Sequence, residues 1–548
     1  MKHIVFLVMI VCTVSGFAQT ATISGRVMDG NGKPLTKANV SITKMGRVKP
    51  DTTLPVSAEG GYSVTLSKPG LWILQFTGVN HKMLELPFLL DKNAREELTV
   101  QLEANAVPSR IDSVVMVGKF NNFNTNGGIT MKYKDGAYHA EAPQGVEEFE
   151  YQIVVFGTPR NETTPPCING TKQEWFEYDG KGQYKSIINT TKNRDIAFDI
   201  AALPKSKHPV TFTFKNPALQ RAAEVFHGMM KYRHMYDVGM ALSMEEFEKS
   251  GNAPQAYNVR TFNTMMNTTK YRDSLEQEIR QESNELALQY MYLHYLMLPQ
   301  QEQNKMITEK SLRVIPASSP VWGADPALLY VALSAKLAGG KEQYISELIN
   351  NNPDEHVVAT TLFNELLQAS TLKDMPRAKE MYKTLTEKYS THPLAGTAKM
   401  YYNPNRKIME GNPLPPISLT TLDKRKLSNE NLKGKYTIID VWSSMNAAST
   451  SNIAALTTAN EKYKNKNLQV ISISLDIKAA DVTAFREKNS MPWIHALAER
   501  GYDSDIVKTL EVVSLPRTIL VGPDGKILAI DLDLRGEKLE HTLKALIQ

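Results

Sequence analysis

Cysteine is the scarcest reactive residue type in this sequence, which holds only Cys12 and Cys167. A cysteine thiolate attacks disulfides, and clusters of cysteines hold zinc or iron–sulfur centres. Two cysteines exclude a disulfide-rich scaffold, a cysteine-based zinc site and an iron–sulfur cluster. We therefore expect no metal and no cofactor. Whether thiol chemistry is also excluded depends on where the two residues lie.

The first cysteine lies within a predicted targeting segment, Met1–Ala18. Lys2 supplies a positive charge, Ile4–Val14 is apolar apart from one threonine, and Gly16–Ala18 has the small-x-small pattern of a cleavage site. These features predict a secretory signal peptide with Gln19 as the new N-terminus. Cleavage would remove Cys12 and leave no partner for an intramolecular disulfide.

Two alternatives for this segment remain open. One is a retained membrane anchor, although Ile4–Val14 is short for a bilayer span. The other is a lipoprotein acylated at Cys12, although Val11 is larger than the residue that usually precedes such a cysteine. No later stretch reaches 18 consecutive apolar residues, so we expect no membrane span in the mature chain.

Cys167 lies in the segment Pro165–Gly170, which contains no Lys, Arg or His to lower the pKa of its thiol. We interpret it as a free or buried thiol without catalytic function. The alternative is a reactive cysteine acting on its own.

The length of 548 residues suggests three or four domains at about 150 residues each. Hydrophobic residues make up 42% and charged residues 22% of the chain, as in soluble globular proteins. The formal net charge is 63 − 58 = +5, which does not indicate a nucleic-acid partner.

Residues 19–106 alternate apolar and polar positions in short runs separated by Gly and Pro, which predicts a β-sandwich. The predicted strands include Thr22–Met28, Asn39–Thr43, Gly61–Leu66 and Leu71–Phe76. The glycines at 25, 32, 61 and 70, with Pro34-Leu35 and Tyr62, resemble the carboxypeptidase-regulatory-like domain. That resemblance implies a structural or adhesive module without catalysis of its own.

Residues 107–216 are again rich in predicted strands. Gly118-Lys-Phe-Asn-Asn-Phe123, the Asp135-Gly turn and the Asn169-Gly turn before Trp175 resemble an early-set, glycogen-binding-like β-sandwich. Such modules stack sugars on exposed aromatic rings. The resemblance implies Phe123, Trp175 and Tyr178 as possible carbohydrate-binding residues, the alternative being that they lie in the core or at a domain interface.

Residues 217–402 contain few glycines and prolines, and their apolar residues recur at helical spacing. Leu286, Tyr290 and Leu293 illustrate this spacing. The stretch Ala378–Tyr389, followed by His392-Pro393, resembles a tetratricopeptide-type helix. We predict an α-helical, partly tetratricopeptide-like domain that serves as a spacer or docking surface.

Residues 411–548 alternate predicted strands and helices and end in a hairpin and a helix, which predicts an α/β fold. Strands are predicted at 435–441, 468–475, 518–521 and 527–530, and helices at 480–489 and 537–547. The whole chain is thus predicted as multidomain, with two N-terminal β-sandwiches, a central helical domain and this C-terminal domain.

The C-terminal domain resembles the thioredoxin fold of TlpA-like (redoxin) envelope thiol–disulfide oxidoreductases. The shared landmarks are Gly411–Pro415, Leu432–Lys435, Val513–Leu520 and Leu534–Gly536. In this comparison Pro516 takes the place of the family's active-site cis-proline, and Arg517 is inserted where the family has Pro-Thr. The family motif F-W-A-S-W-C-x-x-C corresponds to Val441–Ser449.

The catalytic cysteines of that motif are replaced by Asn446 and Ser449. Dithiol exchange needs a thiolate and a second thiol that resolves the mixed disulfide, and neither an amide nor a hydroxyl can replace them. Two interpretations remain. Asn446 or Ser444 caps a helix, or Trp442, Asn446, Ser449 and Pro516 line a groove for a ligand or an extended peptide.

The leading hypothesis is an exported protein of the periplasm or cell envelope, with a redox-inactive thioredoxin-like domain as a binding or scaffold module. Its partner would be an envelope protein or peptide. One alternative is a thiol–disulfide oxidoreductase or peroxiredoxin-like reductase by family descent. The other is a carbohydrate-binding envelope protein with a glycan as its partner.

Overall fold

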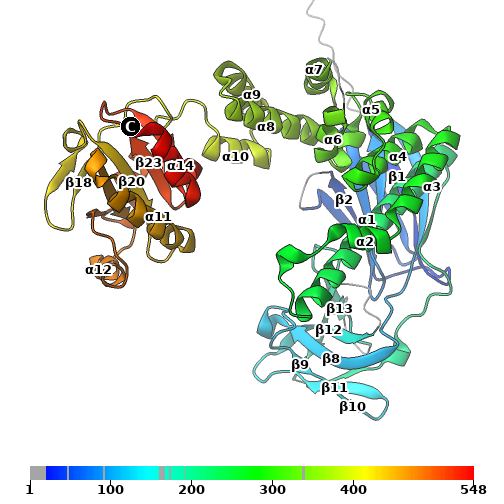
Figure 1. Ribbon diagram of the computed structural model, residues 1–548. Helices are drawn as coiled ribbons and strands as arrows, with labels where there is room; N and C mark the ends of the chain where they lie inside the picture. Colours follow the sequence, from blue (N-terminus) through cyan, green and yellow to red (C-terminus); the bar gives the residue numbers. More distant parts are fainter. Residues whose placement is uncertain are drawn as a thin grey trace, which may run out of the picture. The chain divides into compact units, whose positions relative to one another are not determined.

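The computed structural model describes residues 20–45, 49–90, 93–158, 167–171, 175–191, 193–335 and 340–547. The predicted signal peptide, residues 1–18, lies outside this part. Contacts divide the chain into two compact units, Met1–Thr361 and Leu362–Gln548. We describe each unit by itself (Figure 1).

The first unit begins with a β-sandwich of two four-stranded sheets, ordered β3-β2-β5-β6 and β17-β7-β1-β4. Alternating residues such as Ile23, Val40 and Leu74 fill the space between the sheets. The strands are β1 Ala21–Asp29, β2 Ala38–Lys44, β3 Thr52–Pro55, β4 Gly61–Leu66, β5 Gly70–Gly78, β6 Leu84–Leu90, β7 Ala94–Leu102 and β17 Thr211–Phe214.

Strand β17 comes from the end of the region predicted as the second sandwich, yet it pairs with β7 of the first. Phe214 lies opposite Leu98 in this antiparallel pair and belongs to the core of the first sandwich. The chain therefore returns to the first module before the helices begin, which local alternation could not reveal.

The second sandwich packs a six-stranded sheet against the three-stranded sheet β10-β11-β16. Phe149, Tyr151, Ile153 and Val155 alternate into its core. The strands are β8 Arg110–Gly118, β9 Ile129–Thr130, β10 Lys132–Lys134, β11 Ala137–Glu141, β12 Glu148–Thr158, β13 Cys167–Ile168, β14 Trp175–Tyr178, β15 Tyr184–Asn189 and β16 Asp195–Phe198.

Helices follow the two sandwiches along the chain, as predicted (Figure 1). Helix α1 contacts β6 and β17 of the first sandwich. Helix α4 is buried on every side, because the four consecutive residues 290–293 point in four different directions around the helix and are all in the core. The helices are α1 Pro217–Lys249, α2 Val259–Met265, α3 Thr268–Gln281, α4 Glu285–Met297, α5 Lys305–Val314, α6 Ala327–Ala335, α7 Lys341–Asn351 and α8 Glu355–Thr371. Helix α8 ends in the second unit.

The second unit continues with two helices and a five-stranded sheet of order β22-β21-β20-β23-β24. Strands β20, β21 and β22 are parallel, whereas β23 and β24 run antiparallel to their neighbours. The elements are α9 Met375–Lys388, α10 Pro393–Tyr401, β18 Ser418–Thr420, β19 Lys426–Ser428, β20 Tyr436–Trp442, α11 Ala447–Tyr463, β21 Leu468–Ser474, α12 Ala479–Lys488, β22 Ile494–Leu497, α13 Asp505–Thr509, β23 Arg517–Val521, β24 Ile527–Ile530 and α14 Glu537–Leu546.

Two cores cover the two faces of this sheet. Ile438 of β20 packs with Leu456 of α11 and Leu543 of α14 on one face. Its neighbour Ile439 packs with Leu510 on the other face. A strand buried on both faces reads as a continuous apolar run, which explains why β20 was recognisable in the sequence.

Candidate functional site

The segment that joins β20 to α11 corresponds to the predicted active-site turn. Asn446 is the N-cap of α11, and its Oδ1 accepts a hydrogen bond of 2.8 Å from the backbone N–H of Ser449. This bond satisfies one of the N–H groups that a helix N-terminus leaves without a partner. The carboxamide of Asn446 is therefore engaged in holding the helix end.

Asp476, at the end of β21, holds the turn from the other side. Its carboxylate accepts hydrogen bonds from Ser443 Oγ at 2.6 Å, from Ser474 Oγ at 2.8 Å and from the N–H of Ser444 at 3.1 Å. Hydrogen bonds to an ionised acceptor are stronger than neutral ones. The turn is thus fixed by one buried carboxylate and one helix cap.

The structure does not support a groove lined by Trp442, Ser449 and Pro516. The Trp442 side chain is 0% exposed and packs with Ile453 of α11 and Val482 of α12. Ser449 is buried, and its Oγ has no hydrogen-bond partner among the described residues. Pro516 is also buried, and the Leu515–Pro516 peptide bond is cis.

Strand geometry explains why the groove expectation failed for Trp442. Successive side chains of a strand point to opposite faces of the sheet, so Trp442 shares the face of Ile438 and Asp440. Helix α11 covers that face. Of the four residues predicted to line the groove, only Asn446 is partly exposed.

A buried acid that the sequence analysis did not single out lies beside this site. Asp440 of β20 is buried, and its Oδ1 accepts a hydrogen bond of 3.0 Å from Thr518 Oγ1. Its Oδ2 has no partner within the described part of the chain. Burial raises the pKa of Asp440 to about 7. The available signal was one acid in an otherwise apolar strand.

Arg517, the residue after Pro516, is buried and engaged. Its guanidinium forms an ion pair with Asp531, and its Nε donates to the carbonyl of Leu510 at 3.2 Å. Burial lowers the pKa of Arg517. The arginine therefore stabilises the loop beside the turn and does not face solvent.

Two large apolar side chains flank the turn and are exposed. Met445 is 90% exposed and precedes the cap residue, and Ile477 is 85% exposed and follows Asp476. The hydrogen bonds of Asp476 bring these two segments together. Exposed apolar residues beside a turn are candidates for contact with a partner.

Cys167 lies in the other unit, where β13 pairs with β12. Burial, together with the negative charge of Asp179, raises the pKa of the Cys167 thiol. A raised pKa lowers the fraction of nucleophilic thiolate at neutral pH. Cys12, the other cysteine, lies outside the described residues.

The three residues proposed for carbohydrate binding do not form one platform. Trp175 and Tyr178 point to opposite faces of β14, because they are three residues apart in a strand. Tyr178 faces the first sandwich, where its hydroxyl lies 3.3 Å from Ser41 Oγ. Phe123 is covered by the Lys185 ammonium, 5.3 Å from its ring centre.

Within the residues that the structure describes, no helix is both long and apolar enough to cross a bilayer. In the same residues, no group of three or more His, Cys, Asp or Glu side chains is arranged to hold a metal ion.

Comparisons with known proteins concern the C-terminal part of the chain. The family described as Thioredoxin-like matches residues 434–527. The thiol-disulfide oxidoreductase ResA of Bacillus cereus is 24% identical over 144 residues, which cover 26% of this chain and 80% of the relative. ResA of Bacillus subtilis is 19% identical over 141 residues, which cover 26% of this chain and 77% of that relative.

Among solved structures, a thiol-disulfide oxidoreductase from Bacteroides fragilis is 33% identical, with a TM-score of 0.23, and covers 25% of this chain and 99% of its own. The thioredoxin domain of a thiol-disulfide oxidoreductase from Bacteroides vulgatus is 26% identical, with a TM-score of 0.24. The match covers 26% of this chain and 99% of that domain. The family match establishes that the chain carries a thioredoxin-like domain in its C-terminal unit.

Proposed function

We propose that this protein is an exported envelope protein whose thioredoxin-like domain is redox-inactive and serves as a binding or scaffold module. The observation that carries the proposal is the helix cap made by Asn446. Asn446 occupies the position at which the chemistry of the relatives would need a nucleophilic thiolate.

The chemistry of the turn supports this proposal. Ser449, at the position of the resolving thiol, is a buried hydroxyl, and a hydroxyl is far less acidic than a thiol. Cys167 cannot easily substitute, because burial raises the pKa of its thiol. We infer that the fold is retained while the dithiol reaction is lost.

The binding part of the proposal rests on Met445 and Ile477. These side chains present apolar surface at a turn that Asp476 and Asn446 hold rigidly. A fixed apolar contact costs little conformational entropy on binding. An extended peptide of an envelope partner fits such a surface, with the apolar side chains as its anchors.

The location part of the proposal rests on the leading segment. Residues 1–18 have the charge, apolar run and small-x-small end of a signal peptide. Export would place the mature chain, beginning near Gln19, in the periplasm or at the cell envelope.

A second candidate is a thiol–disulfide oxidoreductase or peroxide reductase. It is favoured by the names of the relatives and by Asp440, a buried acid next to the turn. This function would need an external thiol, because the turn supplies none.

Reductase assays separate the two candidates. We expect the purified mature chain to reduce insulin no faster than dithiothreitol alone, and to show no peroxidase turnover with that thiol. A catalysed rate in either assay would overturn the redox-inactive assignment. The binding part needs a separate test. A Met445→Asp variant, compared with the exposed control Met306→Asp, distinguishes partner binding at the turn from nonspecific apolar contact.

A further inference from the structure

The helical part of the first unit contains a pocket of about 460 Å³ between α1, α2 and α4. Its lining includes Tyr232 and Tyr236 from successive turns of α1, Asn263 from α2 and His294 from α4. Small-molecule pockets span about 300–1,000 Å³ and combine an apolar lining with a few placed polar groups. This pocket has a volume in that range, combines apolar with polar residues in its lining and does not involve the C-terminal unit.

Asn263 gives the pocket an unsatisfied hydrogen-bond donor. The residue is 4% exposed, and its Oδ1 accepts a hydrogen bond of 2.6 Å from the Tyr236 hydroxyl. Its Nδ2 has no partner among the described residues. Buried polar groups are nearly always hydrogen-bonded, so this amide lacks an oxygen acceptor that a ligand could supply.

Two further groups in the pocket are polar but uncharged. The Tyr232 hydroxyl is buried and has no partner in the described part of the chain. His294 is buried, and burial lowers its pKa to about 4, so its ring is neutral at physiological pH. A phenol and a neutral imidazole can each donate or accept a hydrogen bond with a ligand hydroxyl, and the His294 ring also lies 3.4 Å from the Tyr271 hydroxyl.

The charges at the pocket are already engaged with one another. Arg233 Nη1 lies 3.2 Å from Asp325 Oδ2, and Arg233 Nε lies 3.8 Å from Asp237 Oδ2. With one cation and two carboxylates among these groups, the pocket does not favour an anion. The unsatisfied Nδ2 of Asn263, which can only donate a hydrogen bond, does not favour a cationic ligand that lacks oxygen.

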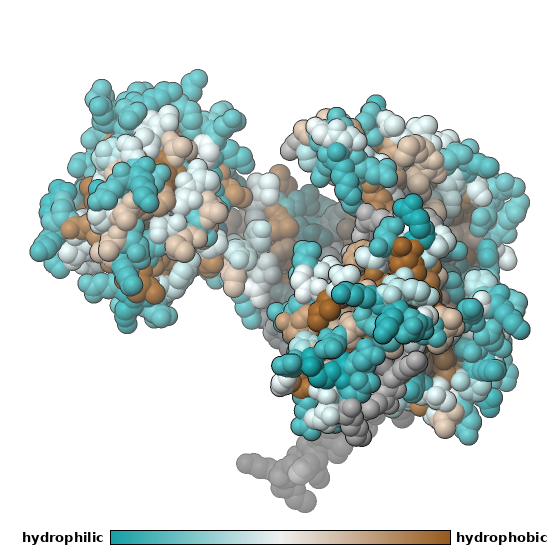
Figure 2. All heavy atoms as spheres, turned by 90° about the horizontal axis from the view of Figure 1, so that it is seen from below, coloured by the Kyte–Doolittle hydropathy of each residue, from teal (hydrophilic) through white to brown (hydrophobic). Residues whose placement is uncertain are grey.

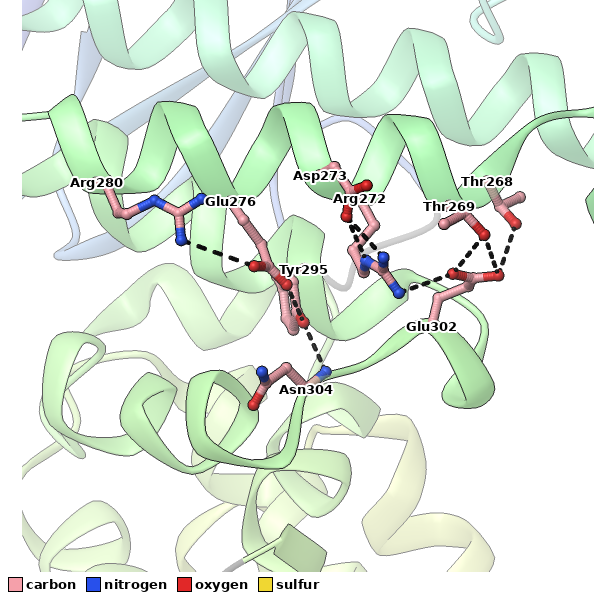
Figure 3. A network of polar contacts seen from close by, with 9 residues as sticks. All are labelled: Thr268, Thr269, Arg272, Asp273, Glu276, Arg280, Tyr295, Glu302 and Asn304. Atoms are coloured by element: carbon pink, nitrogen blue, oxygen red, sulfur yellow. Dashed lines mark hydrogen bonds and ion pairs between the residues drawn. The ribbon is translucent and has the colours of Figure 1, made fainter.

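The wall formed by residues 296–301 is held at both ends, as Figure 3 shows. At one end, Tyr295 donates to Glu276 Oε1 at 3.0 Å, and its hydroxyl accepts from the N–H of Asn304 at 2.6 Å. At the other end, Glu302 of η4 (Gln300–Glu302) accepts from Thr269 Oγ1 at 3.0 Å and pairs with Arg272 at 3.2 Å. These contacts hold this wall of the pocket in place.

We propose that this pocket binds a neutral, polyhydroxylated ring, that is, the pyranose unit of a carbohydrate. The C–H face of such a ring packs on the phenol rings of Tyr232 and Tyr236. Its hydroxyl oxygens accept from Asn263 Nδ2 and bond to Tyr232 and His294. This site is separate from the aromatic residues of the second sandwich and from the turn before α11.

Isothermal titration calorimetry of the mature chain tests the proposal. The probes are maltose, cellobiose and N,N′-diacetylchitobiose, with maltotetraose to distinguish a free disaccharide from the end of a longer glycan. Tetramethylammonium, succinate and trialanine probe the cationic, anionic and peptide alternatives. We expect at least one neutral saccharide to bind and the three alternatives not to bind.

Matched variants locate the binding. Val259 is an exposed residue of the lining, so Val259→Trp should block the pocket without disturbing the core, whereas Met265→Trp, exposed on the same helix but outside the lining, should bind normally. Asn263→Asp keeps the acceptor for Tyr236 and removes the donor, and should weaken binding about tenfold.

Circular dichroism of each variant controls for folding. The proposal is overturned if no saccharide binds, if an ionic probe or trialanine binds instead, or if the well-folded Val259→Trp variant binds saccharide as tightly as the wild type.

Discussion

The backbone N–H of Ser449 donates a 2.8 Å hydrogen bond to Oδ1 of Asn446, so the two residues that the sequence analysis predicts at the positions of a catalytic dithiol are joined as a helix cap. The backbone around them is that of a thioredoxin-like domain, with β20 leading into α11. Under the proposed function, only the chemistry of these two side chains differs from that of a dithiol site, so the difference can be tested by mutation.

We expect the double variant Asn446→Cys and Ser449→Cys to gain insulin reductase activity. A thiol at the N-terminus of a helix experiences the positive end of the helix dipole, which lowers its pKa and raises the fraction of reactive thiolate at neutral pH. The second thiol, three residues further on, would resolve the mixed disulfide. The assay is insulin reduction with dithiothreitol, with a rate at least about tenfold above the wild type expected from the gain in thiolate.

The single variant Asn446→Cys is the matched control, since it has an attacking thiol but no resolving one, and it should turn over more slowly than the double variant because dithiothreitol must resolve its mixed disulfide. A double variant that forms its disulfide yet stays inactive would show that more than the two thiols is missing from the site.

Replacing Asn446 with alanine should destabilise the C-terminal unit. The change removes the acceptor for Ser449 N–H, and loss of such a cap costs about 1 kcal/mol. Hydrogen exchange of peptides from α11 in increasing urea measures the local unfolding free energy. Asn446→Asp keeps an acceptor and should retain stability; equal losses in both variants would show that the cap is not the cause.

The sequence predicted the elements of the second unit better than their exposure. Strand β20 and helix α14 lie within a residue or two of the predicted ranges, because a doubly buried strand and an amphipathic helix have strong patterns. Trp442 was expected in a groove, yet it is in the core. Which helix covers a given face depends on tertiary packing and not on local spacing.

Other features depend on residues far apart in the sequence and could not be predicted from local patterns. Strand β17 pairs with β7 across more than one hundred intervening residues, as the pair Phe214–Leu98 shows. Tyr178 meets the first sandwich at Ser41. Likewise, Asn263 and His294 line a common pocket only because α2 and α4 pack together with α1.

Cys167 should react slowly with alkylating agents. Burial and the nearby charge of Asp179 raise the pKa of its thiol, so less thiolate is present at neutral pH than in an exposed cysteine. Mass spectrometry of iodoacetamide labelling, with glutathione as the reference thiol, measures the rate, which should rise as pH increases above the ordinary thiol pKa of about 8.5.

An Asp179→Asn variant should label somewhat faster than the wild type, because it removes the negative charge, which is the smaller of the two causes that raise the pKa of Cys167. Labelling of the wild type as fast as glutathione at neutral pH would contradict the assignment of Cys167 as an unactivated thiol.

Asp440 should make the stability of the C-terminal unit fall as pH rises. Burial raises the pKa of this acid to about 7 in the folded state, whereas an unfolded aspartate has a pKa of about 3.9. Between these values the folded state binds the proton and the unfolded state has released it, so raising the pH favours unfolding. The loss begins near pH 4, levels off above about pH 7 and amounts to a few kcal/mol at most.

The Asp440→Asn variant removes this titration while keeping an acceptor for the Thr518 hydroxyl. We therefore expect it to be more stable than the wild type at about pH 8 and to lose most of the pH dependence across this window. Hydrogen exchange of β20 peptides in urea, corrected for the intrinsic effect of pH on exchange, gives the unfolding free energy at each pH.

Asp524→Asn, which changes an exposed acid of the same unit, is the control and should leave the slope unchanged. The opposite result would be a wild-type stability that rises from pH 4 to pH 7, with the same slope in Asp440→Asn. It would show that the buried carboxyl does not govern the pH dependence of stability.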